Sequence, residues 1–375
     1  MKSPNHVIRH TSVGRGSHFL ALNKRQHLRK KVHFWEAVAR RVGDVTFRNS
    51  FWTAAPVAAF ASCVLICALT TGAAQPLPAA TEPDGSLYSE VETRVLPMVD
   101  TAAIEAEDLE RESSGRPFAP RFAKNILVAY TLENSGTWET LHDGSRRWRL
   151  RLVSPGALSL NLGLDQFELP TGAEFWIFAP NGSGSQGPYT NANQNAVGGL
   201  WTAVVIGEEI VVELRVPKRT EATIKISSVN HGYRFFGERE ALIPIKRGDC
   251  NVNVVCPEGD PWRDQIRSVA GISISGMYLC TAQLVNNTAE DLTPYLLTAQ
   301  HCVEQSSDAP TVVAYWNFQS PTCSEPAGGS LGQNQSGSTF ISSSQFATGS
   351  DFTLIELDDQ PQPDFDVYYS GWDAR

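Results

Sequence analysis

The residue best suited to acid–base chemistry is a histidine in the last third of the chain. His301 is the only histidine in residues 248–375, and it follows the apolar run Tyr295–Thr298. Imidazole exchanges a proton near neutral pH, so a histidine at a strand end suits proton transfer. Asp351 is a candidate for the anion that orients it, because it precedes the alternating run Phe352–Leu357 and aspartate is unfavourable inside strands. The alternative for Asp351 is an ordinary turn residue.

Metal and cofactor chemistry is not indicated. A zinc site needs several nitrogen, sulfur or oxygen ligands, and the segment around His301 offers one imidazole beside cysteines that we expect to be oxidised. The sequence has no glycine-rich phosphate loop and no calcium-loop pattern. We therefore predict a site without metal and without cofactor.

Charge is divided unevenly along the chain, whose net charge is −9. Residues 1–50 hold 11 Lys and Arg against 2 Asp and Glu, whereas residues 248–375 hold 3 basic and 16 acidic residues. The acidic total argues against a nucleic-acid partner. This uneven distribution of charge indicates that the chain is composed of segments that are processed differently.

Residues 1–74 are typical of an export signal. A basic segment ending at Arg48 precedes the uncharged stretch Phe51–Ala74, whose most apolar part is Ala54–Leu69. That part has the length of a signal-peptide core and is short for a membrane span of about 20 residues. We predict cleavage near Ala74 and secretion, with membrane contact only through this segment. The alternatives are an uncleaved anchor and a buried helix.

The rest of the chain is predicted to be all-β in two parts. Residues 75–120 are rich in Pro, Glu, Ser and Ala and predict a linker with a short helix around Thr101–Glu110. Residues 121–247 show short alternating strands and predict an antiparallel β-sandwich with its tryptophans in the core. Residues 248–375 predict an antiparallel barrel or part of one. The predicted strands include Glu174–Phe178, Leu200–Ile206, Ile210–Val216 and Ala222–Ser227, then Ala270–Ser275, Thr281–Asn286, Tyr295–Thr298, Thr311–Phe318 and Phe352–Leu357.

Cysteine placement agrees with export. Cys63 and Cys67 lie in the signal segment, and the other five all lie in residues 248–375. Clustered cysteines in an exported domain indicate a disulfide framework. Five is an odd number, so one thiol lacks a partner in this chain, and spacing alone leaves the pairing open. The five are Cys250, Cys256, Cys280, Cys302 and Cys323.

Two motifs resemble those of a known family. Leu297–Cys302 (LTAQHC) followed by Asp351–Leu357 (DFTLIEL) is similar to the His and Asp motifs of chymotrypsin-fold serine endopeptidases. The likeness is closer to the secreted bacterial lysyl endopeptidases and covers essentially all of residues 249–375. It extends to Cys250–Asp260, Leu284–Thr288, Val313–Asn317, Ser336–Ser338 and Gly371–Asp373. Upstream, Gly187–Thr190 and Leu200–Thr202 resemble the β-rich propeptide of the same enzymes.

The resemblance implies a role for each chemical group. His301 would be the general base and acid of a His–Asp–Ser triad, and Asp351 would orient it. The substrates would be proteins and peptides, cut after Lys or Arg, and the propeptide would be a partner of its own protease domain. The dibasic pair Lys246–Arg247 would be the processing site. The implied disulfides are Cys280–Cys302 and Cys256–Cys323, with Cys250 left unpaired.

The sequence departs from the family pattern in one respect. In the order His, Asp, Ser the nucleophile follows the aspartate by about 90 residues, and no Gly-x-Ser-Gly segment follows Asp351 here. We therefore expect a signal region (1–74), a linker (75–120), a sandwich propeptide (121–247) and the first barrel of a double barrel (248–375), with the second barrel missing and no activity in the chain as given. The alternative is a non-catalytic truncated homologue whose sandwich is a binding or inhibitory module.

Overall fold

The computed structural model describes residues 90–234, 236, 252–323 and 329–373. The predicted signal segment with Cys63 and Cys67 lies outside these described residues. The processing pair Lys246–Arg247 and Cys250 also lie outside them. Within the described ranges no helix has the length and apolarity needed to cross a membrane.

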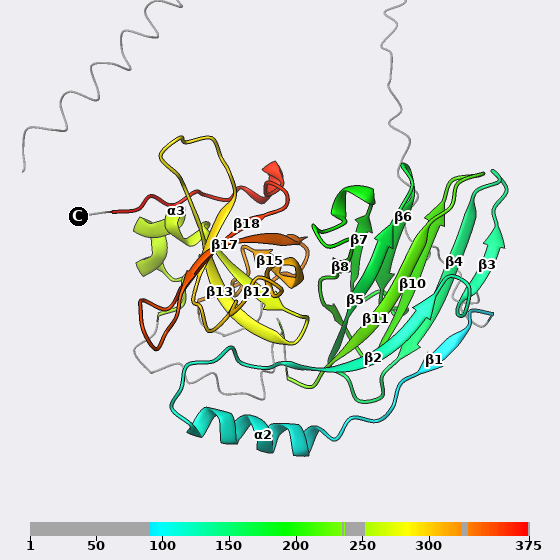
Figure 1. Ribbon diagram of the computed structural model, residues 1–375, viewed down its shortest axis with the longest axis horizontal. Coiled ribbons are helices and arrows are strands. Elements are labelled where there is room, and N and C mark those ends of the chain that lie inside the picture. Colours follow the sequence, from blue (N-terminus) through cyan, green and yellow to red (C-terminus); the bar gives the residue numbers. More distant parts are fainter. Residues whose placement is uncertain (1–89, 235, 237–251, 324–328, 374–375) are drawn as a thin grey trace, which may run out of the picture. The chain divides into compact units, whose positions relative to one another are not determined.

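The first sheet of the sandwich contains six strands in the order β1-β4-β10-β6-β7, with β3 also paired to β4 (Figure 1). Strand β1 runs parallel to β4, so a strand from the predicted linker joins this sheet. The other pairings are antiparallel. The strands are β1 (Thr93–Val95), β3 (Thr137–Thr140), β4 (Arg146–Val153), β6 (Glu174–Phe178), β7 (Ser185–Tyr189) and β10 (Glu209–Val216).

The second sheet packs against the first. Its strand order is β2-β11-β5-β8, with β9 also paired to β5. Leu160 and Leu162 from this sheet form one buried cluster with Trp148, Leu150 and Val212 from the other sheet. Because strand residues alternate between faces, this shared cluster makes the two sheets a sandwich. The strands are β2 (Ala123–Thr131), β5 (Ser159–Glu168), β8 (Leu200–Trp201), β9 (Val205–Ile206) and β11 (Thr223–Gly232).

The strand predicted over Leu200–Ile206 is divided in two. Strands β8 and β9 are separated by residues 202–204. The Thr202 N–H still donates to the Leu162 carbonyl of β5 (2.9 Å), whereas the next two amides bond to side chains. The Ala203 N–H donates to the Tyr189 hydroxyl (2.9 Å), and the Val204 N–H donates to the Tyr315 hydroxyl (3.2 Å). Apolar alternation predicts burial of this segment but cannot reveal that distant hydroxyl groups take its amides.

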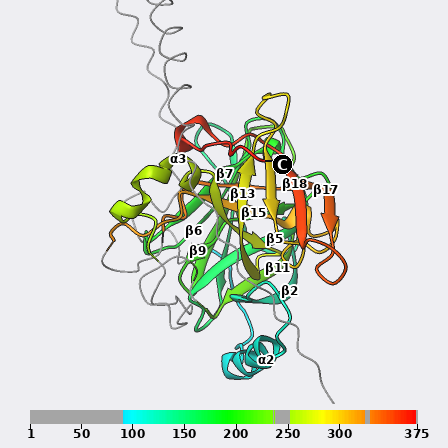
Figure 2. The ribbon, with the colours of Figure 1, turned by 90° about the vertical axis from the view of Figure 1, so that its left-hand side faces the viewer.

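Helix α2 (Thr101–Ser113) lies outside the sheets, at the bottom of Figures 1 and 2. It covers the helix predicted around Thr101–Glu110. Its first turn is capped by Asp100, whose carboxylate accepts a hydrogen bond from the Ala103 amide (3.1 Å). On its inner face Asp108 is buried, with only 3% of its side chain exposed.

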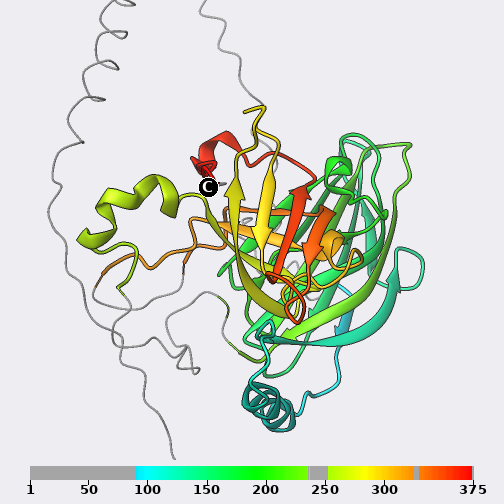
Figure 3. The same cartoon turned by 60° about the vertical axis from the view of Figure 1, so that its left-hand side comes forward.

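The described residues 252–323 and 329–373 contain a single curled sheet of seven strands in the order β16-β15-β12-β13-β14-β18-β17 (Figure 3). The two edge strands, β16 and β17, are separated in sequence by Gly337 alone. A sheet whose edges are consecutive in the chain must curl back on itself, so these strands form an antiparallel barrel. They are β12 (Val269–Ile274), β13 (Tyr278–Val285), β14 (Tyr295–Thr298), β15 (Val313–Trp316), β16 (Asn334–Ser336), β17 (Ser338–Ser344) and β18 (Phe352–Leu357), and the short helix α3 (Arg263–Ile266) precedes them.

The barrel is filled by the inward residues of its strands. Ile272, Leu284, Leu296, Trp316 and Ile355 are fully buried in one cluster. The positions next to them include the polar residues Ser273, Gln283 and Glu356 but also Leu297 and Tyr315, so the alternation expected of an antiparallel strand with one face in the core is only partial.

The sandwich and the barrel share a buried contact of their own. Val204 and Phe122 of the sandwich region cluster with Val313 and Tyr315 of the barrel. The hairpin between β12 and β13 is held by the sandwich, because the Asn161 side-chain amide donates to the Gly276 carbonyl (3.0 Å). Both parts therefore belong to one packed unit.

Candidate active site

The pairing of β14 with β18 brings the two predicted catalytic residues together. The strands are antiparallel, and Thr298 at the end of β14 faces Thr353 near the start of β18. His301 follows the end of β14 by three residues, and Asp351 directly precedes β18. In an antiparallel pair those two positions lie at the same end of the strands.

The carboxylate of Asp351 holds His301 at two points. Its Oδ2 atom lies 2.8 Å from Nδ1 of the imidazole, and its Oδ1 atom accepts the backbone N–H of His301 (3.2 Å). Asp351 has φ +48°, a left-handed conformation that aspartate tolerates better than most residues and that functional sites often contain. The two side chains are 25% and 23% exposed, so the pair is partly open to solvent.

Asp351 is favoured as an anion. Burial by itself raises the pKa of its carboxyl, but hydrogen bonds from the His301 ring and from the His301 backbone amide lower it. The net pKa lies below the usual value of an aspartate. An ionised Asp351 accepting from Nδ1 fixes the ring in the tautomer that has a basic Nε2 atom. In the described part of the chain, no side chain bonds to Nε2.

A disulfide fixes the turn that carries His301. Cys302 is bonded to Cys280 of β13, with Cα atoms 6.1 Å apart and a sequence separation of 22. Behind the turn, the buried Thr353 hydroxyl donates to the Val303 carbonyl (2.8 Å). The residues flanking the imidazole are thus tied to two strands of the barrel.

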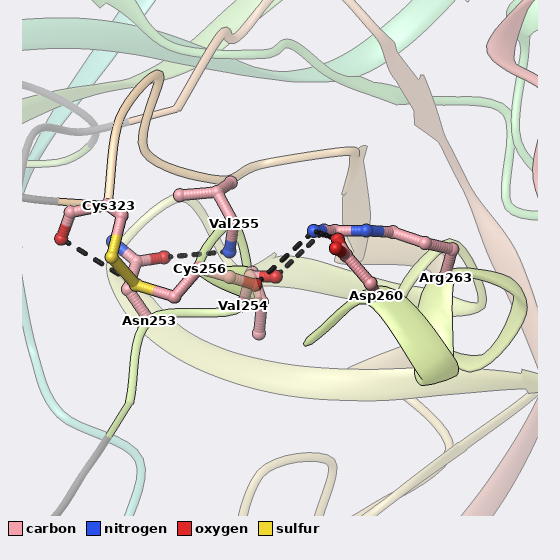
Figure 4. The surroundings of a disulfide bond; sticks show 7 residues. All are labelled: Asn253, Val254, Val255, Cys256, Asp260, Arg263 and Cys323. Carbon is pink, nitrogen blue, oxygen red and sulfur yellow. Dashed lines mark hydrogen bonds and ion pairs between the residues drawn. A yellow bond between two sulfur atoms is a disulfide. The ribbon is translucent and has the colours of Figure 1, made fainter. Parts of the chain in front are cut away.

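A second disulfide, Cys256–Cys323, stands apart from the imidazole and joins the start of the domain to the segment after β15. Figure 4 shows its surroundings, where Arg263 binds the Val254 carbonyl (2.8 Å) and the Asp260 carboxylate (2.6 Å). Both disulfides implied by the family resemblance are therefore present. Two disulfides fit an oxidising, extracytoplasmic environment.

Sulfur atoms lie close to the imidazole without forming a metal site. The Sγ atoms of Cys280 and Cys302 and a ring nitrogen of His301 lie within 4.8 Å of one another. Metals bind cysteine as the thiolate, and both sulfurs here are consumed by the disulfide. This group of three does not have the donors that a zinc ion requires.

A pocket of about 210 Å³ opens beside His301. Barrel residues line one side, including Ser275, Tyr278 and Glu304. Arg111 of α2 and Phe118, which lies between α2 and β2, also line the pocket. These two residues were not predicted from the sequence, because nothing in their neighbourhood marks a site nearly 200 positions away.

The remaining histidines of the described ranges lie in the sandwich, away from this pocket. His142 is exposed in a turn. His231 is buried on β11, and its Nδ1 atom lies 2.7 Å from the Ser154 hydroxyl. Neither contacts His301 or Asp351.

The fold and the site together define a class of protein. The structure is all-β, its curled antiparallel sheets are consistent with the chymotrypsin-like fold, and one barrel carries an imidazole held by a carboxylate. Comparison with known families adds the particular group. The lysyl endopeptidase N-terminal domain family matches residues 95–231, and the lysyl endopeptidase C-terminal domain family matches residues 246–375. The chain belongs to the lysyl endopeptidase family, which is a family of serine-type endopeptidases.

One curated relative is the lysyl endopeptidase of Pseudomonas aeruginosa. It is 23% identical over 303 residues, which cover 72% of this chain and 63% of the relative. The chain thus spans less than two thirds of the length of that protein.

Proposed function

We propose that this chain supplies the acid–base half of a secreted serine endopeptidase. His301 would take the proton from a serine nucleophile through Nε2 and return it to the leaving amine. Asp351 would hold the ring in the required tautomer and stabilise the imidazolium. The serine and the amide groups that bind the oxyanion are not assigned within residues 1–375, and residues 1–375 alone would have no peptidase activity.

The observation that carries this proposal is the double contact between Asp351 and His301. Here one carboxylate binds both the ring and the backbone amide of the same residue, and it does so beside an open pocket. Together with family membership, this arrangement supports an orienting anion more strongly than a turn residue.

The proposed substrates are proteins and peptides, cut on the carboxyl side of Lys. The support for lysine is the family description alone. The charge of the barrel region is compatible with it, because residues 248–375 carry 16 acidic and 3 basic residues, and an acidic surface attracts cationic substrates.

The proposed route to the mature enzyme has two cleavages. The segment 1–74 would direct export and be removed near Ala74. The sandwich would then act as a propeptide that is separated from the barrel at Lys246–Arg247. The contact between sandwich and barrel supports a propeptide that binds its own protease domain.

A fluorophosphonate probe, which labels activated serines, tests the proposal. We expect no labelling of residues 1–375 and one label per molecule in any longer product of the gene that includes a serine nucleophile. His301→Ala should abolish labelling of the longer product, whereas His142→Ala, which changes an exposed histidine of the sandwich, should not. Stoichiometric labelling of residues 1–375 would refute the division of the site. A stable secreted protein that remains unlabelled at every length would instead be the non-catalytic binding module.

A further inference from the structure

The carboxylate that binds His301 stands at the end of an exposed loop. Residues 345–350 connect β17 to β18, and all of them are exposed. Because this loop does not pack in the barrel core, hydrophobic burial does not fix the residue that follows it, Asp351. The left-handed backbone of Asp351 is unfavourable for a residue with a side chain and persists only where its surroundings determine it. The conformation of Asp351 therefore depends on hydrogen bonds.

The hydroxyl of Ser344 closes this loop. Ser344 is the last residue of β17 and lies opposite Phe352, the first residue of β18. Its Oγ atom accepts the backbone N–H of Ser350 (3.1 Å). Ser350 directly precedes Asp351, so this bond fixes the direction in which the chain enters the catalytic aspartate.

The loop backbone packs closely against the same hydroxyl. A Cβ atom at Gly349 would collide with the Oγ atom of Ser344, so glycine is what allows the backbone to approach it. The N–H groups of Thr348 (3.4 Å) and Gly349 (2.8 Å) both donate to the Gln345 carbonyl. This turn brings Gly349 and Ser350 back to the end of β17, where the hydroxyl binds the Ser350 amide.

The loop has a second, weaker contact with the turn that carries the imidazole. The side-chain carbonyl oxygen of Gln300 lies 3.5 Å from the backbone nitrogen of Phe346, which is long for a hydrogen bond. Gln300 directly precedes His301. Of the two side chains that bind the loop backbone here, Ser344 is both the closer and the nearer in sequence to Asp351.

Loss of the Ser344 hydroxyl should loosen the loop without unfolding the protein. Ser350 is exposed, so water can replace the hydroxyl as acceptor for its amide. What is lost is the fixed direction of the chain that enters Asp351. A carboxylate that turns away from this direction no longer accepts from Nδ1 of His301.

We propose that Ser344 is a positioning residue of the active site. Its hydroxyl holds the end of the loop so that the Asp351 carboxylate reaches both the ring and the backbone amide of His301. Ser344 acts through Asp351 and not on the substrate. This inference rests on the proposed endopeptidase function, because the orientation of the ring matters for catalysis only if His301 is the general base.

The experiment measures the tautomer of His301, since an acceptor on Nδ1 keeps the proton on that nitrogen. Nitrogen NMR of residues 1–375 with isotopically labelled histidine gives the ratio of the Nδ1–H to the Nε2–H form. The disulfides are kept intact, the pH is one at which the ring is neutral, and loss of the signals in His301→Gln assigns them. Ser344→Ala should lower the ratio about fivefold, the factor that corresponds to one neutral hydrogen bond. Ser344→Thr, which keeps a hydroxyl, should preserve the wild-type ratio.

Two further variants separate positioning from a general loss of structure. The matched control Ser342→Ala removes an exposed hydroxyl two positions earlier on β17 and should leave the ratio unchanged. Gly349→Ala should lower the ratio by a different route, because its Cβ atom displaces the Ser344 hydroxyl. Urea unfolding should give Ser344→Ala and Ser342→Ala the same midpoint. Should Ser344→Ala fail to fold, the ratio in Gly349→Ala decides in its place.

Three results would overturn the role of Ser344. They are a wild-type ratio in Ser344→Ala, an equal decrease in Ser342→Ala, and a decrease in Ser344→Thr as large as that in Ser344→Ala. None of these measurements requires a nucleophile. The positioning role can therefore fail while fluorophosphonate labelling still supports the proposed function, and a failure of labelling would leave the tautomer ratios unchanged.

Discussion

His301 and His231 differ in solvent exposure and in the groups that bind their rings. His301 lies at the rim of a pocket with a carboxylate on Nδ1, so its protonated form has a counterion. His231 is 1% exposed and faces the Ser154 hydroxyl, and among the described residues its Nε2 atom has no hydrogen-bond partner. The first environment places an acceptor carboxylate beside a partly exposed ring. The second environment opposes the charged form.

The buried histidine predicts a loss of stability in mild acid. Burial lowers the pKa of His231 below its usual value of about 6.5. Above about pH 6.5 the imidazole is neutral in both the folded and the unfolded chain, and the stability is at its full value. Between that pH and the lowered folded-state pKa only the unfolded chain binds the proton, so the free energy of unfolding decreases as the pH falls through this interval. One proton limits this slope to about 1.4 kcal/mol per pH unit.

Urea unfolding followed by tryptophan fluorescence at pH 7, 6 and 5 measures that slope. His231→Asn should flatten it, while His142→Asn, which changes an exposed histidine, should keep the wild-type slope. Equal slopes in the wild type and in His231→Asn would show that other groups cause the acid sensitivity.

At the scale of elements, the strands around the site follow from local sequence. The alternation in Tyr295–Thr298 and in Phe352–Leu357 predicts β14 and β18 with the bounds that the structure has. The division of Leu200–Ile206 was not predictable, because it depends on the Tyr189 and Tyr315 hydroxyls. Cysteine spacing left the disulfide pairing open, and only the resemblance implied it. Arg111 escaped prediction because its contact with Tyr278 arises from tertiary packing and has no local pattern.

Removing either disulfide should lower the free energy of unfolding, but only removal of Cys280–Cys302 should also change the geometry around His301. Removing Cys280–Cys302 with paired alanines should cost about 3 kcal/mol, and removing Cys256–Cys323, which spans 67 positions, about 4 kcal/mol. Only the first removal should raise the reactivity of His301 toward diethyl pyrocarbonate, because only that bond fixes its turn. Urea unfolding gives the two costs. A His301 rate raised equally by both removals would contradict the assigned role of Cys280–Cys302.

At the scale of the whole molecule, the sandwich contacts the barrel at the tip of the hairpin between β12 and β13. Gly276 has φ +62°, and a Cβ atom at this position would collide with the side chains of Asn161 and Asn230. The Asn230 side-chain amide donates to the Oδ1 atom of Asn161 (2.8 Å), so the two side chains form a fixed surface, or cradle, that leaves no room for a Cβ atom at Gly276. The hairpin belongs to the barrel and the cradle to the sandwich.

Gly276→Ala should therefore loosen the contact between the two parts. We expect the wild type to unfold in urea in one transition reported by both Trp148 and Trp316, which lie in the sandwich and barrel cores respectively. The variant should show separate transitions. Gly115→Ala is the matched control, since Gly115 has φ +68° and open space around it, and it should cost only the backbone strain of about 1 kcal/mol. If both alanines have the same effect, the cradle does not couple the two parts.

The order of strands in the barrel has a consequence for how the protein is made. As the nascent chain emerges during translation, the β14 edge that faces β18 stays unfilled until residues 352–357 arrive, because β18 inserts between β14 and β17. Asp351 emerges immediately before that last strand. Asp351 therefore leaves the ribosome together with β18, the strand that completes the barrel. When β18 pairs with β14, the Asp351 carboxylate is placed beside the His301 ring.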